Sequence, residues 1–182
     1  TSYVCASTAQ KLCQSEKLLT IFLKSQQPKF VLLETDQLYL EMSTLDVLQC
    51  NLEALLPVRG YHDNWKFVRP SQMLRTPDYS CRDSLKGYHL RKTIDALDPE
   101  AYMLPTEEAE PIFSAAEAGV RRIKALCDRA GARLVLYTAP NAAAWNTPRH
   151  NAVQALADSL EVPYLDGNLE VTNLVWQADT LD

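Results

Sequence analysis

The pattern of apolar and polar residues between positions 133 and 166 predicts a strand, a helix and a second strand. Leu134 to Tyr137 form a continuous apolar run, which is typical of a buried strand. A short helix is expected next, with Thr147 as its N-cap and Pro148 at its first position. The stretch VPYLD gives the second strand. A strand, a crossover helix and a strand make a βαβ unit, which implies a parallel sheet with helices on its faces.

Similar patterns upstream predict three more helices and one more strand. A helix capped by Ser7 is expected to run to about Lys24, and the uninterrupted hydrophobic residues Phe30 to Leu33 predict a strand buried on both faces. Residues 44–56 and 110–130 carry apolar side chains at helical spacing. Gly131 follows the last of these helices, where a left-handed backbone commonly ends a helix.

Residues 57–108 differ in character from the rest of the chain. Prolines and glycines punctuate this segment and aromatic residues lie between them, so we expect a long irregular insertion that packs over the sheet. Such an insertion is often a binding loop or a lid, and it can equally be an inert cover. The whole chain, residues 1–182, is expected to form a single α/β domain around one core.

Composition and charge exclude some classes of function. The chain has 182 residues and a net charge of −5, with acidic and basic residues interspersed, which argues against a nucleic-acid-binding face. No apolar run approaches the roughly 18 residues of a membrane span, so membrane contact is expected only through a segment outside this chain. No glycine-rich phosphate loop occurs, and no cofactor is expected.

The five cysteines include no pair with zinc-ligand spacing, and no histidine lies at metal-ligand spacing from another histidine or a cysteine, so no metal site is expected. Their odd number leaves at least one free thiol. Cys127 lies on the apolar side of a predicted helix and is expected to be a small core residue. Pairing of Cys50 with Cys81 stays open at this point.

Several stretches together resemble the SGNH/GDSL-hydrolase-like proteins of bacterial cell surfaces, which include relatives of the proteins that transfer acyl groups to polysaccharides and teichoic acids. The stretches that carry the resemblance are QQPKFVLLETD, RGYHDNWKFVRP, SLKGY, AEPIFSAAEAGVRRIKALCDRAGARLVLYTAP and VPYLDGN. The resemblance implies a three-layer α/β/α fold of the flavodoxin-like, SGNH type. It also implies an extracytoplasmic serine esterase or acyltransferase that acts on an O-acylated glycan or a related polymer.

The catalytic motifs of that family are missing from this chain. No Gly-Asp-Ser occurs, no histidine follows His150, and the strand that ends in LLETD lacks the Gly-x-Asn-Asp pattern. A serine hydroxyl is a weak nucleophile without a nearby base. We therefore expect either a fragment that lacks its first strand and its C-terminal catalytic loop, or a non-catalytic relative, and we favour the fragment. Asp182 is a candidate for the opening of the Asp-x-x-His motif.

The remaining candidate residues come from their places along the chain. His62 is a catalytic candidate because Asp63 can orient it, although an ordinary loop histidine is the favoured interpretation. Ligands of parallel sheets bind at the carboxyl ends of the strands, which makes Thr35, Asp36 and Asn141 candidates for substrate binding. Turn formation is the simpler role for Asp36 and Asn141.

Two other polar positions receive structural interpretations. His150, in the first turn of a predicted helix, is expected to be solvent-exposed. Asp166 and Asn168 flank Gly167 in what resembles an ordinary tight turn.

Two functional hypotheses follow, with a third that is weaker. The first is an SGNH-type esterase or acyltransferase domain, which is inactive as a fragment and has a carbohydrate or an acylated polymer as its partner. The second is a binding or scaffolding domain with the same fold and no catalysis. The third is a cytosolic flavodoxin-like or response-regulator domain, against which the long insertion and the missing acidic cluster count.

Overall fold

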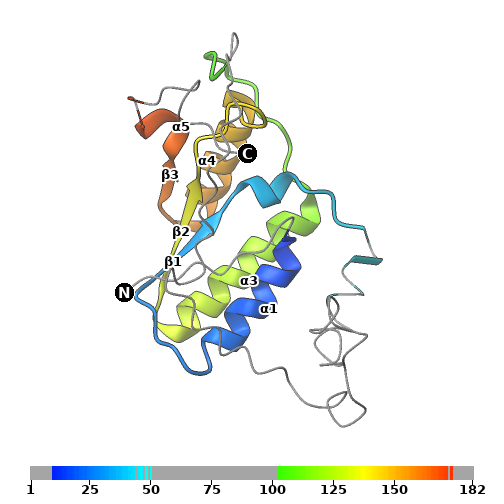
Figure 1. Cartoon of the computed structure of the whole chain (residues 1–182), viewed down its shortest axis with the longest axis vertical. Coiled ribbons are helices and arrows are strands. Elements are labelled where there is room, and N and C mark those ends of the chain that lie inside the picture. The colour runs from blue at the N-terminus through cyan, green and yellow to red at the C-terminus, as the bar shows by residue number, and fades with distance from the viewer. Residues whose placement is uncertain are drawn as a thin grey trace, which may run out of the picture.

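A computed structural model describes residues 10–43, 45, 46, 48, 50, 102–171 and 173 of the chain. Three parallel strands form the centre of this part, and helices pack against them (Figure 1). The elements in chain order are α1 (Leu12–Phe22), β1 (Phe30–Glu34), the 3₁₀ helix η1 (Asp36–Tyr39), α3 (Ser114–Ala130), β2 (Arg133–Thr138), α4 (Thr147–Leu160), β3 (Tyr164–Asp166) and α5 (Gly167–Glu170).

The sheet confirms the predicted βαβ unit. Its strand order is β1-β2-β3, and both pairings are parallel. Leu33 pairs with Leu136, and Leu136 pairs with Tyr164, so one row of side chains crosses all three strands. Because the strands run in the same direction, their carboxyl ends meet at one edge of the sheet.

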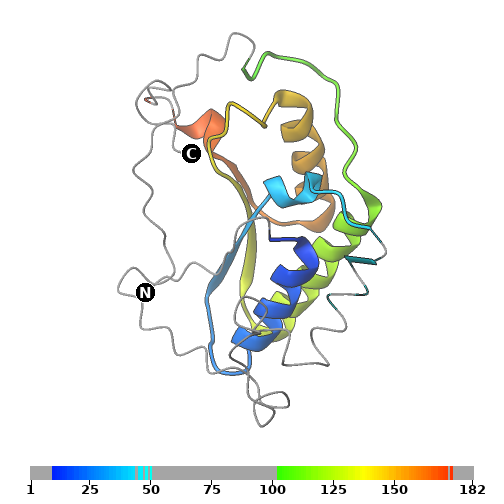
Figure 2. The same ribbon diagram turned by 45° about the vertical axis from the view of Figure 1, so that its right-hand side comes forward.

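The long helices α1, α3 and α4 lie on the same side of the sheet (Figure 2). Between them and the strands is a core that includes Leu136, Val120 and Val153, each fully buried. This packing confirms an α/β architecture with a parallel sheet. The described long helices cover one face of the sheet. A helical layer over the other face, which an α/β/α fold requires, stays a prediction.

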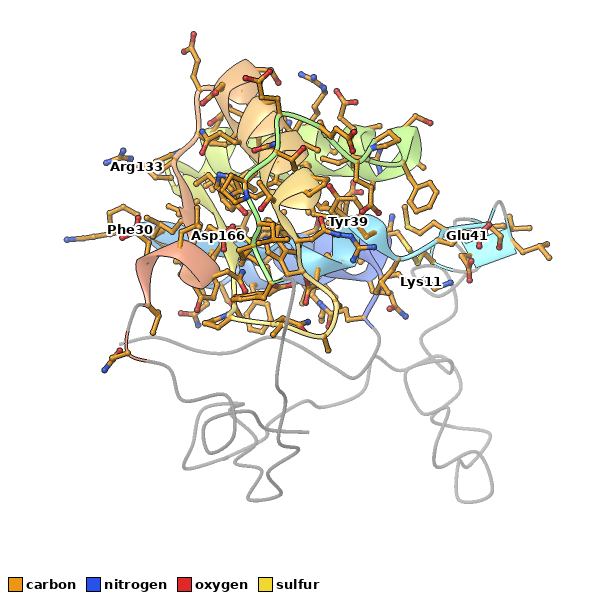
Figure 3. The ribbon with its side chains drawn as sticks, turned by 90° about the horizontal axis from the view of Figure 1, so that it is seen from above. Lys11, Phe30, Tyr39, Glu41, Arg133 and Asp166 are labelled. Atoms are coloured by element: carbon orange, nitrogen blue, oxygen red, sulfur yellow. A yellow bond between two sulfur atoms is a disulfide. The ribbon has the colours of Figure 1, made fainter. Side chains whose placement is uncertain are left out.

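The opposite face of the sheet carries exposed apolar side chains. Leu32 is 62% exposed, Phe30 is 53% exposed and Leu165 is 48% exposed. The guanidinium of Arg133 lies 5.8 Å from the centre of the Phe30 ring, and both side chains point outward (Figure 3). The prediction that the strand at Phe30–Leu33 is buried on both faces is therefore wrong, because a run of apolar residues does not show which face is covered.

Helix α3 is the best predicted element, although it begins at Ser114 rather than at residue 110. It ends, as expected, at Gly131, whose φ of 70° is left-handed. Gly119 in the same helix faces α1 closely: a Cβ atom added there would lie 2.5 Å from Cδ2 of Leu12. A larger residue at position 119 would require the Leu12 side chain to move or the two helices to separate.

The N-terminus of α4 corrects the predicted cap. Asn146, not Thr147, is the N-cap: its backbone is extended and its side chain accepts a hydrogen bond from the Arg149 N–H at 2.9 Å. Thr147 is the first helical residue, and its Oγ1 is buried without a hydrogen-bond partner. Both residue types cap helices well, and only the backbone geometry decides between neighbours. Pro148 consequently stands at the second helical position.

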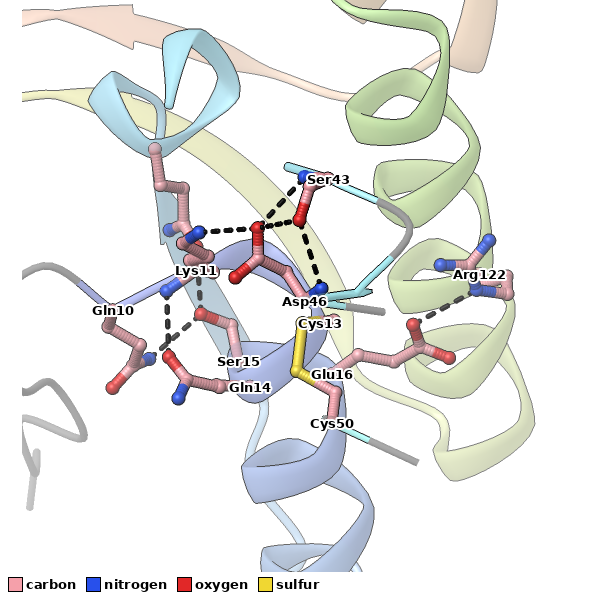
Figure 4. Close-up of a disulfide and its surroundings, with 11 residues drawn as sticks. Gln10, Lys11, Cys13, Gln14, Ser15, Glu16, Ser43, Asp46, Cys50 and Arg122 are labelled. Atoms are coloured by element: carbon pink, nitrogen blue, oxygen red, sulfur yellow. Dashed lines mark hydrogen bonds and ion pairs between the residues drawn. A yellow bond between two sulfur atoms is a disulfide. The ribbon is translucent and has the colours of Figure 1, made fainter. Parts of the chain in front are cut away.

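A disulfide joins Cys13 of α1 to Cys50 (Figure 4). Pairing of Cys50 with Cys81 is therefore wrong, since the count and spacing of cysteines carry no information on which side chains meet. Residues 45, 46, 48 and 50 of the helix predicted over 44–56 are helical, and Lys11 Nζ forms an ion pair with Asp46 Oδ2 at 2.7 Å beside the disulfide. The segment is thus fastened to α1 both covalently and by charge.

Cys127 is free and fully buried in the core, as predicted. Burial, with a smaller contribution from Asp128, raises the pKa of its thiol to about 11. A thiol that stays protonated reacts poorly, so the role of Cys127 in this fold is packing.

Of the predicted insertion at 57–108, residues 102–108 belong to the described part, and they are irregular, as expected. Residues 106–110 cross the N-terminal part of α4. Asn151 Nδ2 donates to the carbonyl oxygens of Thr106 and Glu108 at 2.9 and 2.8 Å. Arg149 forms an ion pair with Glu110 at 3.0 Å. These contacts hold the incoming chain against the helix that follows β2. The rest of the insertion lies outside the described residues. Ser7 also lies outside them, and helix α1 begins at Leu12 with Lys11 as its N-cap, so the prediction that Ser7 caps this helix is wrong.

Candidate functional site

The three strands end at one edge of the sheet, and polar residues follow each of them. Asp36 follows β1, and Asn141 lies three residues beyond the end of β2. The structure brings these two predicted site residues together: Asn141 Nδ2 donates to Asp36 Oδ2 at 2.9 Å. The other carboxylate oxygen of Asp36, Oδ1, is buried and has no hydrogen-bond partner.

Thr35, the third predicted binding residue, is fully buried. Its Oγ1 lies 2.5 Å from Oγ1 of Thr138, which in turn lies 2.8 Å from the hydroxyl of Tyr164. The three hydroxyl groups therefore form a chain from the residue that follows β1, through β2, to β3. Thr35 lies at the expected edge, but its side chain links strands and is closed to solvent.

Glu34, the last residue of β1, bends over the same edge. Its Oε2 accepts from the Asp36 N–H at 2.8 Å and its Oε1 lies 3.4 Å from the Ala139 nitrogen. Burial, together with repulsion from Asp36, raises the pKa of the Glu34 carboxyl to about 7, although these backbone hydrogen bonds oppose the rise. Glu34 therefore changes its charge near neutral pH, as few carboxylates do.

Asp166, at the end of β3, is the most heavily hydrogen-bonded side chain at this edge. Its Oδ2 accepts from Trp145 Nε1 at 3.1 Å and from the Tyr164 hydroxyl at 3.1 Å, and lies 2.7 Å from His150 Nδ1. Its Oδ1 accepts from the backbone and side-chain nitrogens of Asn168. A buried carboxylate with this number of donors is held in one orientation.

The position of His150 overturns the prediction that it is solvent-exposed. Its side chain is 19% exposed, and its ring packs against the ring of Tyr164, with centroids 5.4 Å apart. The prediction is wrong because the helix alone does not determine the surroundings of His150: Asp166 lies 16 residues away in sequence and meets His150 through the βαβ crossover. The prediction that Asp166 is an ordinary tight-turn residue is also incomplete, because its carboxylate bonds Trp145 and Tyr164 and contacts His150.

Asn168 joins Asp166 to the cluster around Asn141. Its Oδ1 accepts from the Asn141 N–H at 2.8 Å and also from the hydroxyl of Tyr102. Asn141 Oδ1 accepts from the backbone N–H groups of Ala143 and Ala144, at 3.2 and 3.1 Å. Amide and carboxylate groups from all three strand ends thus form one connected hydrogen-bond network.

The chemistry offered at this edge is proton transfer and hydrogen bonding. In the part of the chain that the structure describes, no group of three or more His, Cys, Asp or Glu side chains is arranged to hold a metal ion. No helix within the described ranges is long and apolar enough to cross a membrane. His62 and Asp182, the two catalytic candidates from the sequence, lie outside the described residues, so their roles stay predictions.

The sequence places Glu34 at the end of a strand beside Thr35 and Asp36, but it shows neither the raised pKa of Glu34 nor the pairing of His150 with Asp166. One signal is present: VPYLD predicts a strand of a parallel sheet, and the helix that precedes such a strand packs beside it. A histidine in the first turn of that helix is at the same level as the carboxyl end of the strand, where Asp166 lies.

No protein-family model, no curated protein and no solved structure matches this chain. No relative's activity therefore bears on the candidate site.

Proposed function

We propose that this chain is an SGNH-type domain that binds an O-acylated extracellular glycan, or a related hydroxylated polymer, at the carboxyl edge of its sheet, as part of an esterase or acyltransferase. The observation that carries the proposal is the convergence of Asp36, Asn141 and Asn168 at that edge. Asp36 Oδ1 has no hydrogen-bond partner among the described residues and can accept a hydrogen bond from a sugar hydroxyl group, while the side-chain amides of Asn141 and Asn168, which already bond to protein groups, fix the shape of this edge. Ligands of parallel α/β sheets bind at this edge as a rule.

Two further features support parts of the proposal. The Cys13–Cys50 disulfide is typical of an oxidising compartment, which favours an extracytoplasmic location. The exposed Phe30, Leu32 and Leu165 favour a second helical layer over that face, because parallel sheets are ordinarily covered on both sides. A second layer is what a three-layer α/β/α fold requires.

The alternative is a binding or scaffolding domain without catalysis. It is favoured by one observation: among the described residues, no serine or cysteine is hydrogen-bonded to His150. The described part of the chain thus contains polar residues that can bind a ligand and no activated nucleophile.

Binding is tested on the 182-residue chain by calorimetry with acetylated xylo-oligosaccharides and with the same oligosaccharides after saponification. We expect saturable binding of the acetylated form. Asp36→Asn keeps the shape of the side chain and removes its charge, and we expect it to weaken binding about tenfold, as for a lost hydrogen bond to a charged group. Glu107→Gln, on the irregular segment, is the control. Equal binding by wild type and Asp36→Asn would contradict the placement of the ligand.

Catalysis is tested on the full-length gene product with p-nitrophenyl acetate and a fluorophosphonate label. Release of p-nitrophenol together with labelling of a serine is expected for the enzyme. Glycan binding without labelling would support the scaffolding alternative. For the 182-residue chain alone we expect no turnover.

A further inference from the structure

Four basic side chains gather where the strands of the sheet begin. Lys24 follows α1, Lys29 precedes β1, Arg129 lies in the last turn of α3, and Arg133 is the first residue of β2. All four are exposed. We propose that this basic end, defined by Lys24, Lys29, Arg129 and Arg133, docks the domain on an anionic lipid bilayer. The inference goes beyond the proposed function and does not rest on it.

The packing of α1 on α3 brings the ends of the two helices together. Leu12 packs against Gly119, and further along Glu16 Oε2 accepts from Arg122 Nε at 2.9 Å. The two helices therefore run in the same direction. Continuing this register places the end of α1, at Phe22, beside the last turn of α3.

The strands begin at the same end of the molecule. The carbonyl oxygen of Lys29 accepts from the Arg133 N–H at 2.9 Å, so the starts of β1 and β2 lie side by side. The N–H of Lys24 donates to the carbonyl oxygen of Ile21 at 3.2 Å, which keeps Lys24 at the end of α1. Figures 1 and 2 both show the C-terminal ends of α1 and α3 beside the starts of β1 and β2, at the lower end of the molecule.

The charges of the basic end are not neutralised by ion pairs. Within the described ranges, none of its four cations pairs with a carboxylate. Every other described lysine or arginine except Lys17 has such a partner: Lys11, Arg121, Arg122, Lys124 and Arg149. Because the whole chain carries a net charge of −5, the positive charge here is a local separation and not a consequence of composition.

The acidic side chains near this end are engaged or set apart. Asp128 pairs with Lys124 at 2.7 Å, and Asp158 accepts from Gln154 Nε2 at 2.8 Å. Glu161 precedes β3, which is separated from β1 by β2. The surface around α1, α3 and the start of β1 thus keeps its positive charge.

Exposed apolar side chains lie beside these cations. Ile21 and Phe22, the last residues of α1, are 53% and 40% exposed. At a bilayer surface, lysine and arginine meet the lipid phosphates while neighbouring apolar side chains enter the boundary between headgroups and acyl chains. A soluble polyanion would use the charges alone, so Ile21 and Phe22 favour a bilayer as the partner.

Helix dipoles explain only part of the arrangement. Lys24 and Arg129 lie at the C-terminal ends of α1 and α3, where the helix dipole stabilises cations. Lys29 and Arg133 lie at the starts of strands, and sheets have only small net dipoles. Stabilisation by a dipole also leaves an exposed cation available to a partner.

Docking by the basic end fixes the direction in which the candidate site faces. Asp36 and Asn141 lie at the carboxyl edge of the sheet, and the basic end lies at the amino edge. With the basic end on the bilayer, the carboxyl edge points away from the lipid and is open to a polymer in solution. This contact belongs to the folded domain and adds to the membrane contact expected through a segment outside the chain.

The first test is co-sedimentation of the 182-residue chain with phosphatidylcholine vesicles, with and without phosphatidylglycerol. We expect binding only to the vesicles that contain phosphatidylglycerol. Binding should be lost in about 1 M salt, which screens charges beyond about 3 Å. Equal binding to both kinds of vesicle, or binding to neither, would overturn the proposal.

The second test removes two cations of the basic end. Each cation near an anionic bilayer strengthens binding about fivefold, so Lys24→Gln combined with Lys29→Gln should weaken it about 25-fold. Arg121→Gln combined with Arg122→Gln is the matched control, because it removes the same charge from cations that are already paired on α3. Equal losses in the two double variants would indicate attraction by net charge alone and would overturn the placement.

The third test separates a bilayer from a soluble polyanion. Ile21→Ser should weaken binding to phosphatidylglycerol vesicles about fivefold, since an apolar side chain that enters lipid is lost. Leu104→Ser, at a residue 60% exposed on the irregular segment, should leave binding unchanged. Circular dichroism checks the fold of both variants. Vesicle binding that is insensitive to Ile21→Ser, with equally tight binding to dextran sulfate, would overturn the bilayer as the partner.

The outcome is separable from that of the proposed function. Asp36→Asn lies at the opposite edge and should leave vesicle binding unchanged. The combined Lys24→Gln and Lys29→Gln variant should bind acetylated xylo-oligosaccharides as the wild type does. Loss of vesicle binding in Asp36→Asn would overturn docking by the basic end, and absence of glycan binding in the wild type would overturn the proposed function alone.

Discussion

Replacement of Glu34 by glutamine should change how the stability of this protein depends on pH. The folded protein holds the Glu34 carboxyl at a pKa of about 7 against an ordinary value of 4.5, chiefly because the group is buried. Folding therefore favours the protonated form. Glutamine keeps an oxygen that can accept from the Asp36 N–H, at present 2.8 Å from Oε2, and it carries no charge at any pH.

The sign follows from proton binding. Between pH 4.5 and about 7 the folded protein holds a proton on Glu34 that the unfolded chain has released. Stability must then fall as pH rises through this window, and it levels off above the folded pKa. Each pKa unit corresponds to about 1.4 kcal/mol, and solvent near the half-buried side chain reduces the effect, so we expect a loss of about 1–3 kcal/mol.

The assay is urea unfolding followed by circular dichroism at several pH values from 5 to 8. The difference in unfolding free energy between Glu34→Gln and wild type should grow by about 1–3 kcal/mol from the acidic to the alkaline end of the series. Using the difference removes contributions from other titrating groups. Glu107→Gln, on the irregular segment, should show no such trend. A difference that is constant with pH would refute the conclusion that burial and the charge of Asp36 raise the pKa of Glu34.

Three further predictions concern stability and reactivity. Asn146→Ala should lower the free energy of unfolding by about 1 kcal/mol through loss of the helix cap, whereas Thr147→Ala should have little effect, because Thr147 Oγ1 has no partner; urea unfolding of both variants checks this. Replacing Cys13 and Cys50 together by alanine should cost about 2–4 kcal/mol in the same assay, as expected for a bridge across 37 positions, and an unchanged midpoint would contradict the pairing. Cys127 should resist iodoacetamide at pH 8 until urea unfolds the protein, since burial raises its pKa to about 11; rapid labelling of the folded protein would contradict its burial.

The elements that could be predicted are those whose own residues determine them. Helix α3 has an apolar stripe and a terminal glycine, and the run at Leu134–Tyr137 reads directly as a strand. The uncovered face of β1 could not be predicted, because apolar content shows that a strand is compatible with burial and not which elements cover it. The resemblance to SGNH proteins predicts helices on both faces of the sheet, and the described long helices cover one face.

The candidate site was predicted in part for the same reason. Asp36 and Asn141 each follow a predicted strand, which makes them candidates, and the structure shows them bonded to each other. The pairing of His150 with Asp166 requires the register of β3 beside α4, which local patterns do not contain. The raised pKa of Glu34 depends on burial by residues distant in sequence, so no local motif announces it.

The close packing at Gly119 has a consequence for how this sequence can diverge. A side chain at position 119 would collide with Leu12, so α1 and α3 constrain each other at a single pair of positions. In any set of related sequences, glycine at 119 should accompany a large aliphatic residue at 12, and alanine or serine at 119 should accompany a smaller one. Covariation of these two positions would then indicate, from sequences alone, that α1 and α3 pack against each other at this point.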